Sequence, residues 1–463
     1  RAGLGEGGGH GWLLAQQIVH GEACYDTWVI DPRRFAGHTN VELTALKAIE
    51  DYQNEFRFHF PNEHRPAGRM AKTTPLTPVL EAEGADFTVV NGWKRAEYFK
   101  PTPDFEVTHG FGFDETFDVV AAEVAAVQNA VGLTEVNGFN RFEITGGDAW
   151  DFLDRMVCGT VPKRPGRVGL AYLLNHHGML KSEATIANIP ASERGPDRIW
   201  YGSAAASELH DMDWLTQHIR DGEDVQIQSL TNDQTILVLA GPKAQAVLQS
   251  VSRADWSDAA FPWLSVRECF VGIAPATVMA VSFSGERAYE IHVPNVSLYA
   301  AYTALRAAGQ AHGLKLFGAL AVDSMRLEKG YLHWKADILT EFDPFETGLD
   351  RFVKMQKPGF VGQETLGARE VAGPSKKLVT LTLEARDAPA HGGASVMLEG
   401  RVVGTVTSGG WGHRVQKNIA YAFVEPAFSA TGQVFHIDSL GKSVPAQVVH
   451  PALYDPQMER LRG

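Results

Sequence analysis

The sequence predicts an α+β protein with a small connector domain, two pseudo-repeated lobes and a C-terminal small β-barrel. Three observations lead to this prediction. At 463 residues the chain is too long for one compact core. A unit of strand, glycine turn and helix occurs near residue 145 and again near residue 240. From about residue 376, short strands alternate with glycine-rich turns, which is typical of a small barrel.

Composition excludes several classes of function. The formal charge is -13 and no Lys/Arg run forms a basic face, so we expect no nucleic-acid partner. Three cysteines lie far apart, at Cys24, Cys158 and Cys269, without the spacing of a disulfide framework or a zinc site. No apolar run is long enough for a membrane span, and no signal segment is visible. We expect a cytoplasmic protein, or a mitochondrial-matrix protein if the source is eukaryotic, with no membrane partner.

The first residues, "GLGEGGGHGWLLAQQIVHGE", predict a glycine loop that opens a short helix and ends at Gly21. Free backbone N–H groups at such a helix start suit a cofactor edge. A dinucleotide fingerprint also needs a preceding strand, which is absent, so a plain tight turn remains the alternative. Because the chain opens on Arg1 and runs straight into glycines, we expect a further domain upstream.

Residues 27 to about 105 are rich in aromatic residues and prolines, which predicts a small α+β connector. Within it, Phe56, Phe58 and Phe60 alternate as one face of a strand would.

The two pseudo-repeated units share a pattern at a constant offset of 95 residues, in which Gly146, Ala149 and Leu153 correspond to Gly241, Ala244 and Leu248. An offset this long predicts two related lobes rather than a short-period solenoid. Such lobes can enclose a cleft.

A third unit follows the second lobe. It begins with a hairpin in "PATVMAVSFSGERAYEIHVP" and continues into two helices, the second of which ends at Gly330.

A carboxylate stands in the middle of the predicted strand "KSEATIANI". Alternation places Glu183 on one face with Thr185, Ala187 and Ile189. Small neighbours leave room for a ligand, and poor solvation raises the pKa of a carboxylate toward the range useful for proton transfer. The alternative is a glutamate on an edge strand that faces water beside Lys181.

A second carboxylate occupies a similar position in "SGERAYEIHVP". Tyr289, Ile291 and Val293 alternate inward, which leaves Glu290 and His292 on the other face. A fixed carboxylate beside aromatic rings can accept two N–H donors from a flat heterocycle. A solvated strand face is again the alternative.

No nucleophile elbow, P-loop or H-E-x-x-H motif is present, and the pair His176 and His177 is more typical of a turn than of a metal site. We therefore predict no metal centre.

Several segments in order resemble a known family. "GLTEVNGFNRFEITG", "YLLNHHGMLKSEATI", "DSMRLEKGYLHWKADI" and "GTVTSGGWGHRVQKNIAYAFV" are similar to the tetrahydrofolate-binding aminomethyltransferase fold of the glycine-cleavage T-protein. "DPRRF", "FPNEHRPAGR" and "NGWKRAEYF" resemble the connector of dimethylglycine and sarcosine dehydrogenases, and "GEGGGHGWLLAQQIVHGE" resembles the last cofactor-contacting part of their flavin domain.

The resemblance implies a flavin- and folate-dependent N-methyl amine demethylase. FAD, held mostly by the flavin domain, would oxidise an N-methyl amine to an iminium, and tetrahydrofolate would capture the one-carbon unit. The flavin domain would lie in the same chain or in a partner subunit. An iminium must be kept from water, because it hydrolyses to formaldehyde.

The resemblance also implies roles for individual residues. Glu183 stands where the family carries its catalytic aspartate, and Phe283 stands where a tyrosine is common. Flavin contact would fall on Gly8, Gly9, His10 and Gly11. The implied folate-binding residues are Glu290, Phe283, Thr185, Phe139, Tyr172, Arg326 and Trp411.

The implied domain boundaries are 1–26 for the end of a flavin domain, 27–108 for the connector, 109–372 for the T-protein-like folate domain and 373–463 for the barrel. Two alternatives remain open for the function. The folate domain would be a non-catalytic channelling or docking module of an amine oxidase that releases formaldehyde, or the chain would be a separate folate-binding subunit of a flavoprotein complex.

Overall fold

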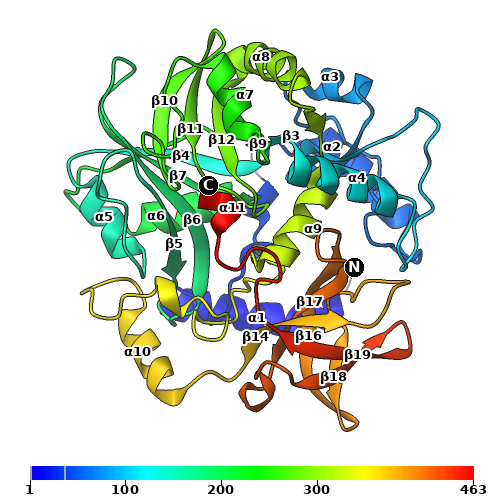
Figure 1. The fold of residues 1–463 in the computed structure, drawn as a ribbon. Coiled ribbons are helices and arrows are strands. Elements are labelled where there is room, and N and C mark those ends of the chain that lie inside the picture. Colours follow the sequence, from blue (N-terminus) through cyan, green and yellow to red (C-terminus); the bar gives the residue numbers. More distant parts are fainter. Residues whose placement is uncertain (1–2, 36–37, 463) are drawn as a thin grey trace.

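The computed structural model describes residues 3–35 and 38–462. Figure 1 shows two sheet-and-helix lobes and a β-barrel arranged around helix α9 (Ala319–Lys329). The predicted α+β architecture with a C-terminal barrel is confirmed.

The first lobe is a five-stranded sheet in the order β5-β6-β7-β4-β8. Its strands are β4 (Phe139–Thr145), β5 (Val168–Leu174), β6 (Leu180–Ile189), β7 (Arg198–Ala205) and β8 (Gln226–Ser229). Helices α5 (Ala149–Met156) and α6 (Glu208–Gln217) cover one face. Apolar residues recur at helical spacing in α5, so Phe152, Leu153 and Met156 reach the same buried cluster as Phe142 and Ile144 of β4.

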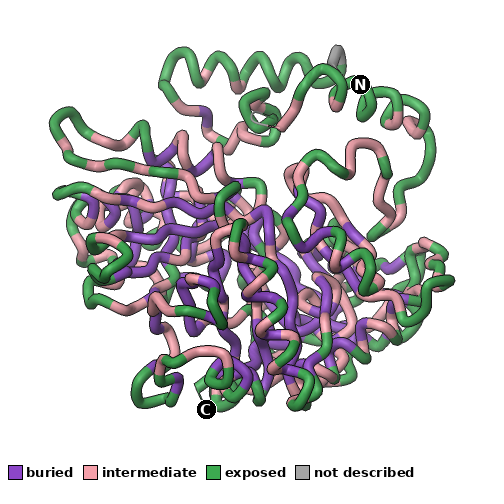
Figure 2. Tube along the Cα trace, turned by 90° about the horizontal axis from the view of Figure 1, so that it is seen from above, coloured by how far each residue is buried: buried purple, intermediate pink, exposed green. Residues whose placement is uncertain are grey.

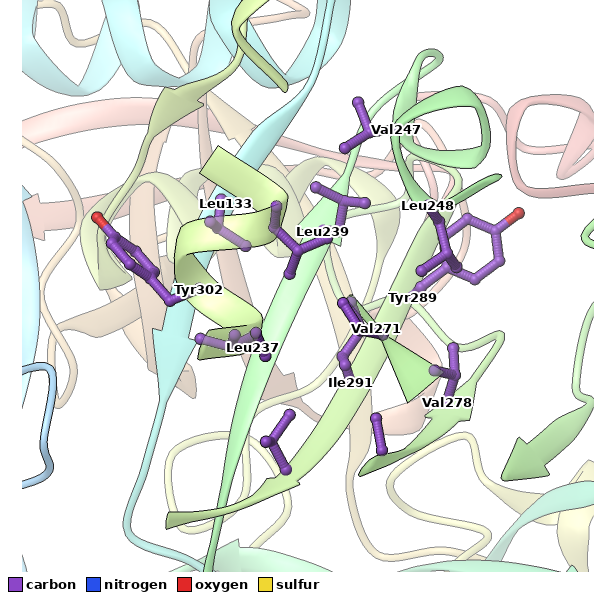
Figure 3. Close-up of a cluster of buried hydrophobic side chains, with 14 of the residues drawn as sticks. Leu133, Leu237, Leu239, Val247, Leu248, Val271, Val278, Tyr289, Ile291 and Tyr302 are labelled. Atoms are coloured by element: carbon purple, nitrogen blue, oxygen red, sulfur yellow. The ribbon is translucent and has the colours of Figure 1, made fainter. Parts of the chain in front are cut away.

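The second lobe is a six-stranded sheet in the order β10-β11-β12-β9-β3-β13. Its strands are β3 (Gly132–Val136), β9 (Gln234–Ala240), β10 (Val266–Val271), β11 (Ala274–Met279), β12 (Ala288–Pro294) and β13 (Lys315–Leu316). The helices α7 (Ala244–Val251) and α8 (Leu298–Gln310) pack on its outer face, and the short turn η3 (Asn295–Ser297) leads into α8. Figure 3 shows Leu237 and Leu239 of β9 in this core with Ile291 of β12 and Val247 of α7.

The predicted repeat is visible in the glycines that follow β4 and β9. Gly146 and Gly241 both have a positive φ, of 117° and 125°. A Cβ atom at Gly146 would lie 2.0 Å from the carbonyl oxygen of Asp224, and one at Gly241 would lie 2.5 Å from that of Val127. Each turn therefore needs glycine both for its backbone conformation and for the close approach of a neighbouring chain segment.

The inner faces of the two sheets meet. Ala187 of β6 and Trp200 of β7 form one buried cluster with Val266 of β10 and Met279 of β11. Each lobe thus keeps its helices outside and turns its other face toward its partner, so residues on these inner faces lie near the centre of the molecule, as the buried centre of Figure 2 illustrates.

The barrel closes in the order β14-β17-β16-β15-β18-β19. Its strands are β14 (Lys377–Leu383), β15 (Ser395–Leu398), β16 (Arg401–Gly412), β17 (Lys417–Val424), β18 (Val434–Ser439) and β19 (Lys442–Val449), with the short turn η5 (Pro426–Phe428) after β17. Between the second lobe and the barrel lie α9, the short turn η4 (Asp350–Phe352) and α10 (Gln363–Ala372). Gly330 ends α9 at a φ of 75°, as predicted.

A buried charge network joins the barrel to the second lobe. Arg414, after β16, binds Glu286 before β12 at 2.9 Å and Glu328 of α9, and its guanidinium lies 3.8 Å from the ring centroid of Tyr454. Glu286 also accepts hydrogen bonds from Tyr454 at 2.7 Å and from Arg460 of α11 (Glu459–Arg462) at 2.7 Å. The C-terminal segment is held across both units by this network.

The N-terminal part differs from the prediction in two places. The glycines at positions 7 to 11 lie inside a helix, α1 (Gly3–His20), rather than in a loop, and Gly21 ends that helix at a φ of 78°. The segment of Phe56, Phe58 and Phe60 forms no strand, because no neighbouring strand pairs with it; Phe56 and Phe58 are exposed. Ahead of that segment the chain forms η1 (Trp28–Ile30), η2 (Pro32–Phe35) and α2 (Val41–Gln53). Figure 2 shows α1 along the outside of the molecule.

The rest of the connector is α3 (Thr77–Ala82) and the hairpin β1 (Ala85–Val90) and β2 (Trp93–Phe99), followed by α4 (Thr116–Asn129). Asp26 ties the preceding segment to the first lobe and to the loop after α9, because it binds Lys335 at 2.7 Å and lies 3.6 Å from His210 of α6. No helix in the described part of the chain has the length and apolar composition needed to cross a membrane. The boundaries at 26, 108 and 372 stay predictions.

We predict that Arg414→Met destabilises the protein by about 3–5 kcal/mol, because it leaves Glu286 and Glu328 buried without their shared cation. The matched control is Arg401→Met. Arg401 forms an exposed ion pair with Glu425 at 3.0 Å, and its loss should cost at most about 1 kcal/mol. Urea denaturation of the two variants measures the difference. Equal losses of unfolding free energy in the two variants would contradict the larger stabilisation that we attribute to the buried network.

Candidate functional site

Glu183 lies on a central strand and not on an edge. Strand β6 pairs with β5 on one side and β7 on the other. Ser182 and Ala184 point into the packed side of the sheet, whereas Glu183 and Thr185 are half-buried on the inner face. The predicted alternation is confirmed, and the alternative of a water-facing glutamate on an edge strand is wrong.

The Glu183 carboxylate has one strong partner. Tyr172, directly opposite on β5, donates a hydrogen bond from its hydroxyl to Glu183 Oε2 at 2.8 Å. Burial raises the pKa of Glu183 to about 7, although the Tyr172 bond stabilises the charged form and opposes the shift. A carboxyl group that titrates near neutral pH can both accept and return a proton, which is what general acid–base chemistry requires.

The inner face continues from β6 across β7 to β4. Thr185 stands opposite Gly202, which stands opposite Arg141. Gly202 is needed because the indole of Trp200 lies over it, so a Cβ atom there would be 2.1 Å from the Trp200 ring. Arg141 is fully buried and donates to the carbonyl oxygen of Thr231 at 2.8 Å.

Glu290 and His292 project from β12 on the second lobe toward this face. The Glu290 side chain keeps 28% of its surface accessible, and Glu290 Oε2 lies 3.4 Å from Nε2 of His292. His292 is buried, and its ring meets that of Trp200 edge-on at 4.8 Å. This contact packs the second lobe against the first. His292 therefore does not lie on a solvated strand face.

Two aromatic residues predicted to bind folate are partly exposed. Phe283, 39% exposed in the loop between β11 and β12, stacks on Tyr331 with ring centroids 6.0 Å apart and planes 16° from parallel. Phe139, half-buried at the start of β4, lies under the guanidinium of Arg95 at 5.0 Å. Such partly exposed rings offer flat faces to a planar ligand.

Burial shifts the pKa of three groups whose side chains keep some accessible surface. Burial raises the pKa of Glu183, lowers the pKa of Arg95 to about 10 and lowers the pKa of His333. Part of each side chain nevertheless remains exposed. Glu183 lies on the inner face of β6 in the first lobe, and we call the inner-face region around it the recess.

Two predicted folate residues make other contacts. Arg326, buried in α9, binds Asp323 at 2.7 Å, Asp337 at 2.5 Å and Ser408 of the barrel at 3.1 Å. Its contacts therefore join α9 to the barrel.

Trp411 of β16 packs against Phe113 and Phe117, at ring-centroid distances of 6.0 and 5.8 Å, beside a cavity of about 220 Å³. The folate-binding roles of Arg326 and Trp411 stay predictions.

Gly8, Gly9, His10 and Gly11, the predicted flavin contacts, are exposed on α1. A flavin contact there also stays a prediction. Among the described residues, no group of three or more His, Cys, Asp or Glu side chains is arranged to hold a metal ion.

Sequence reasoning missed Arg95 and Arg141. Arg95 lies in the strand "WKRAEYF" together with the charged residues Lys94 and Glu97. A sequence of this kind is indistinguishable from that of a strand with a solvated face. Arg141 lies in β4, which is buried on both faces, so alternation carries no signal there. The tertiary packing identifies these arginines as interior charges: Arg141 lies within the first lobe, and Arg95 reaches from the connector hairpin to Phe139.

Comparison with known protein families identifies three matching regions. The family model of the GCVT N-terminal domain matches residues 76–357, and that of the glycine cleavage T-protein C-terminal barrel domain matches residues 376–455. The model of the FAD dependent oxidoreductase central domain matches residues 20–74.

Curated relatives match nearly all of the chain. Dimethylglycine dehydrogenase, mitochondrial, of Rattus norvegicus is 32% identical over 99% of this chain and 53% of its own length. The formaldehyde-forming 4-methylaminobutanoate oxidase of Paenarthrobacter nicotinovorans is 31% identical over 98% of this chain and 55% of its own length. The chain thus spans about half the length of the relatives it matches.

The fold also matches a solved structure. The glycine cleavage system aminomethyltransferase T of Bartonella henselae superposes with a TM-score of 0.72 at 22% identity and covers 83% of this chain and 98% of its own. The lobes and the barrel therefore have the T-protein arrangement.

We predict that Glu183→Gln becomes more stable relative to the wild type as pH rises through neutrality. The folded-state pKa of Glu183 is raised from 4.5 to about 7, so between these values the folded state keeps a proton that the unfolded state has lost. Wild-type stability falls across that window and stays lower above it, whereas glutamine carries no charge to desolvate. Melting temperatures of both proteins from about pH 5 to about pH 9 test this prediction. A constant difference would mean that Glu183 does not titrate there.

We also predict that Tyr172→Phe raises the pKa of Glu183 further, because the phenol hydrogen bond stabilises the ionised carboxylate. The measurement is the infrared band of the protonated carboxyl group as a function of pH, assigned by subtracting the spectrum of Glu183→Gln. Tyr299→Phe, which changes an exposed tyrosine on α8, is the control and should leave the titration unchanged. A pKa that falls in Tyr172→Phe would contradict the assigned direction of the bond.

Proposed function

Because the chain belongs to the glycine cleavage T-protein family, whose N-terminal domain model covers residues 76–357, we propose that it binds tetrahydrofolate between its two lobes. We propose further that it is the folate-binding part of an FAD-dependent N-methyl amine demethylase and passes the one-carbon unit to tetrahydrofolate. The observation that carries this proposal is the Glu183–Tyr172 pair, which holds a half-buried carboxyl group of near-neutral pKa on the inner face of the first lobe.

The residues of the recess fit a reduced pterin. A pterin is flat and presents N–H donors along one edge. Glu290 supplies a carboxylate for two such donors, and its Oε2 lies 3.4 Å from Nε2 of buried His292. Phe139 and Phe283 supply partly exposed ring faces. Thr185, beside Glu183 on the same face, adds a hydroxyl group that can hydrogen-bond to the ring edge.

The chemistry of the chain itself centres on one proton. Tetrahydrofolate, when bound, supplies the nitrogen that takes up the one-carbon unit. Glu183 takes up and returns the proton at that nitrogen, because its pKa of about 7 makes both directions accessible. Tyr172 holds Oε2 of Glu183 through its hydroxyl and so restricts the carboxylate to one orientation. A reactive iminium has to be kept from bulk water during this transfer, because water would hydrolyse it.

The oxidation step belongs to FAD outside the residues of this recess. Residues 20–74 match a domain of FAD-dependent oxidoreductases, and one relative is named a dimethylglycine dehydrogenase. We therefore propose a flavin domain in the same protein or in a partner subunit, with Gly8 to Gly11 as its contact on this chain. An N-methyl amine is the proposed substrate.

A second candidate is favoured by a different relative. The oxidase of Paenarthrobacter nicotinovorans, 31% identical, is described as formaldehyde-forming. In that case the same recess would hold or guide the one-carbon product without transferring it, and Glu183 would have no part in turnover. The two candidates predict different effects of changes at Glu183.

We predict that the full chain binds tetrahydrofolate and that Glu290→Gln weakens binding about 10- to 100-fold, because a charge-assisted pair of hydrogen bonds to the pterin edge is lost. Isothermal titration calorimetry measures both constants. The matched control is Glu193→Gln, which changes an exposed glutamate and should bind as the wild type does. No detectable binding by the wild-type chain would remove folate from the proposal.

In the complete flavin-containing enzyme, Glu183→Gln should abolish folate-dependent capture of the one-carbon unit and leave amine oxidation unchanged. The reason is that glutamine keeps the shape of the side chain but cannot take up the proton. Separate assays of amine consumption and of methylene-tetrahydrofolate measure the two steps. An unchanged yield of methylene-tetrahydrofolate would remove Glu183 from the transfer step and favour the formaldehyde-releasing candidate.

A further inference from the structure

A cavity of about 440 Å³ lies where the two lobes join. Its walls come from the segment before β5 and the loop after β6 in the first lobe, and from β10 and the segment before it in the second. Backbone hydrogen bonds join the lobes here: Val168 donates to the carbonyl oxygen of Leu264, and Val266 donates to that of Gly166, each at 2.9 Å. Among the described residues that line this cavity there is none to which we assign folate binding.

Two arginines of the first lobe line the cavity without a carboxylate partner. Arg164 is exposed, and no residue in the described ranges 3–35 and 38–462 is hydrogen-bonded or ion-paired to its guanidinium. Arg167 is half-buried and donates to Oγ of Ser265 and to the carbonyl oxygen of Trp263, each at 3.0 Å. Burial lowers the pKa of Arg167, and the positive charge of Arg164 lowers it further. The two cations therefore repel each other beside the cavity.

The second lobe contributes a third arginine to the same cavity. Arg267 of β10 donates to the carbonyl oxygens of Asp255 at 2.7 Å and Ala260 at 3.0 Å, so these partners are neutral too. The carboxylate of Asp255 does not line the cavity and accepts the backbone N–H of Ser257 at 2.9 Å. Each guanidinium carries more N–H donors than these bonds use, so both lobes keep donors for a ligand.

The carboxylate among the described lining residues is that of Glu268, and it is already neutralised. It accepts a hydrogen bond from Oγ of Ser192 at 2.5 Å and binds Arg198 at 2.5 Å, and Arg194 lies 3.8 Å from it. The Glu268 side chain is also only 7% exposed. The cavity is therefore locally positive, although the whole chain carries a formal charge of -13.

We propose that this cavity binds the phosphate group of a small organic molecule and that the bound phosphate links the two lobes. A phosphate group carries a charge of about −1.5 to −2 at neutral pH and has three acceptor oxygens, so it can bind guanidinium groups from both lobes at once. A carboxylate carries one charge and is matched by a single planar fork. The prolines at 165, 190 and 262 give the cavity apolar surface for the organic part of the ligand.

Binding across the joint has a consequence for stability. The ligand is held by Arg164 and Arg167 of the first lobe and by Arg267 of the second, so the site is complete only when the lobes are packed together. A ligand that binds the folded state alone stabilises it by mass action. The phosphate compound should therefore raise the melting temperature of the chain. The site goes beyond the proposed function and does not depend on tetrahydrofolate.

Calorimetric titration of the full chain with phenyl phosphate and with benzoate tests the proposal. The two ligands share an apolar ring and differ in the anionic group, and potassium chloride keeps the ionic strength constant. The wild type is compared with Arg164→Gln and Arg267→Gln, which each remove one cation from one lobe. Arg253→Gln, which changes an exposed arginine of the second lobe outside the cavity, is the matched control.

We expect the wild type to bind phenyl phosphate about 10-fold more tightly than benzoate, and each of the two cavity variants to bind phenyl phosphate about 10-fold more weakly than the wild type. Arg253→Gln should bind as the wild type does. Phenyl phosphate should raise the melting temperature of the wild type and raise that of Arg164→Gln much less.

No binding of phenyl phosphate by the wild type, or equal affinities for the two ligands, would overturn the phosphate site. Because Arg164 is exposed and no internal hydrogen bond is lost with it, unchanged binding in Arg164→Gln also overturns the proposal. Weaker binding in only one of the two cavity variants would show that the phosphate does not link the lobes. Titration of Arg164→Gln with tetrahydrofolate keeps the two proposals separate, because this variant should bind the folate as the wild type does.

Discussion

The contact between Trp200 and His292 is the constraint on which the interior of this protein depends. It joins the inner faces of the two sheets with ring centroids 4.8 Å apart, and it is possible only because Gly202 leaves room for the indole. Glu290 stands two residues before His292 on β12, and Thr185 of β6 stands opposite Gly202 of β7. Since side chains alternate along a strand, the ring contact also fixes which side of β12 Glu290 occupies. The packing of the two sheets therefore also determines where the side chains of the candidate site lie.

The distribution of buried charge separates structure from function. Arg414, which joins the barrel to the second lobe, is neutralised by Glu286 and Glu328. By contrast, the partner of Glu183 is a phenol, and the contact of Arg95 is with a phenylalanine ring. Local conflicts of this kind lower stability, and they persist where a ligand or a reaction needs them.

Much of the fold could be predicted from sequence because its signals are local. The alternation around Glu183, the glycines at 146 and 241 and the turn-rich barrel strands each reflect a backbone requirement within a few residues. The predictions that were wrong concern segments whose secondary structure is determined by tertiary contacts. Glycine is a poor helix former, yet the segment before Gly21 is helical, and alternating phenylalanines near residue 58 found no strand to pair with. The sequence could not decide whether Glu183 faces water, because that depends on the packing of the second sheet. It could not identify Arg95 as an interior charge, because an unpaired interior arginine and a solvated one give the same sequence pattern.

The length of the side chain at position 183 follows from its neighbour across the strands. Tyr172 and Glu183 are directly opposed, so their Cβ atoms are about 5 Å apart and the phenol hydroxyl extends well above the sheet. A carboxylate must stand equally high to accept its hydrogen bond, and glutamate reaches roughly 1.5 Å further than aspartate would. The methylene by which glutamate exceeds aspartate is therefore matched by a tyrosine that orients the carboxylate. The pair sets both the reach and the orientation of this carboxylate, so its geometry is a property of β5 and β6 together and not of one residue.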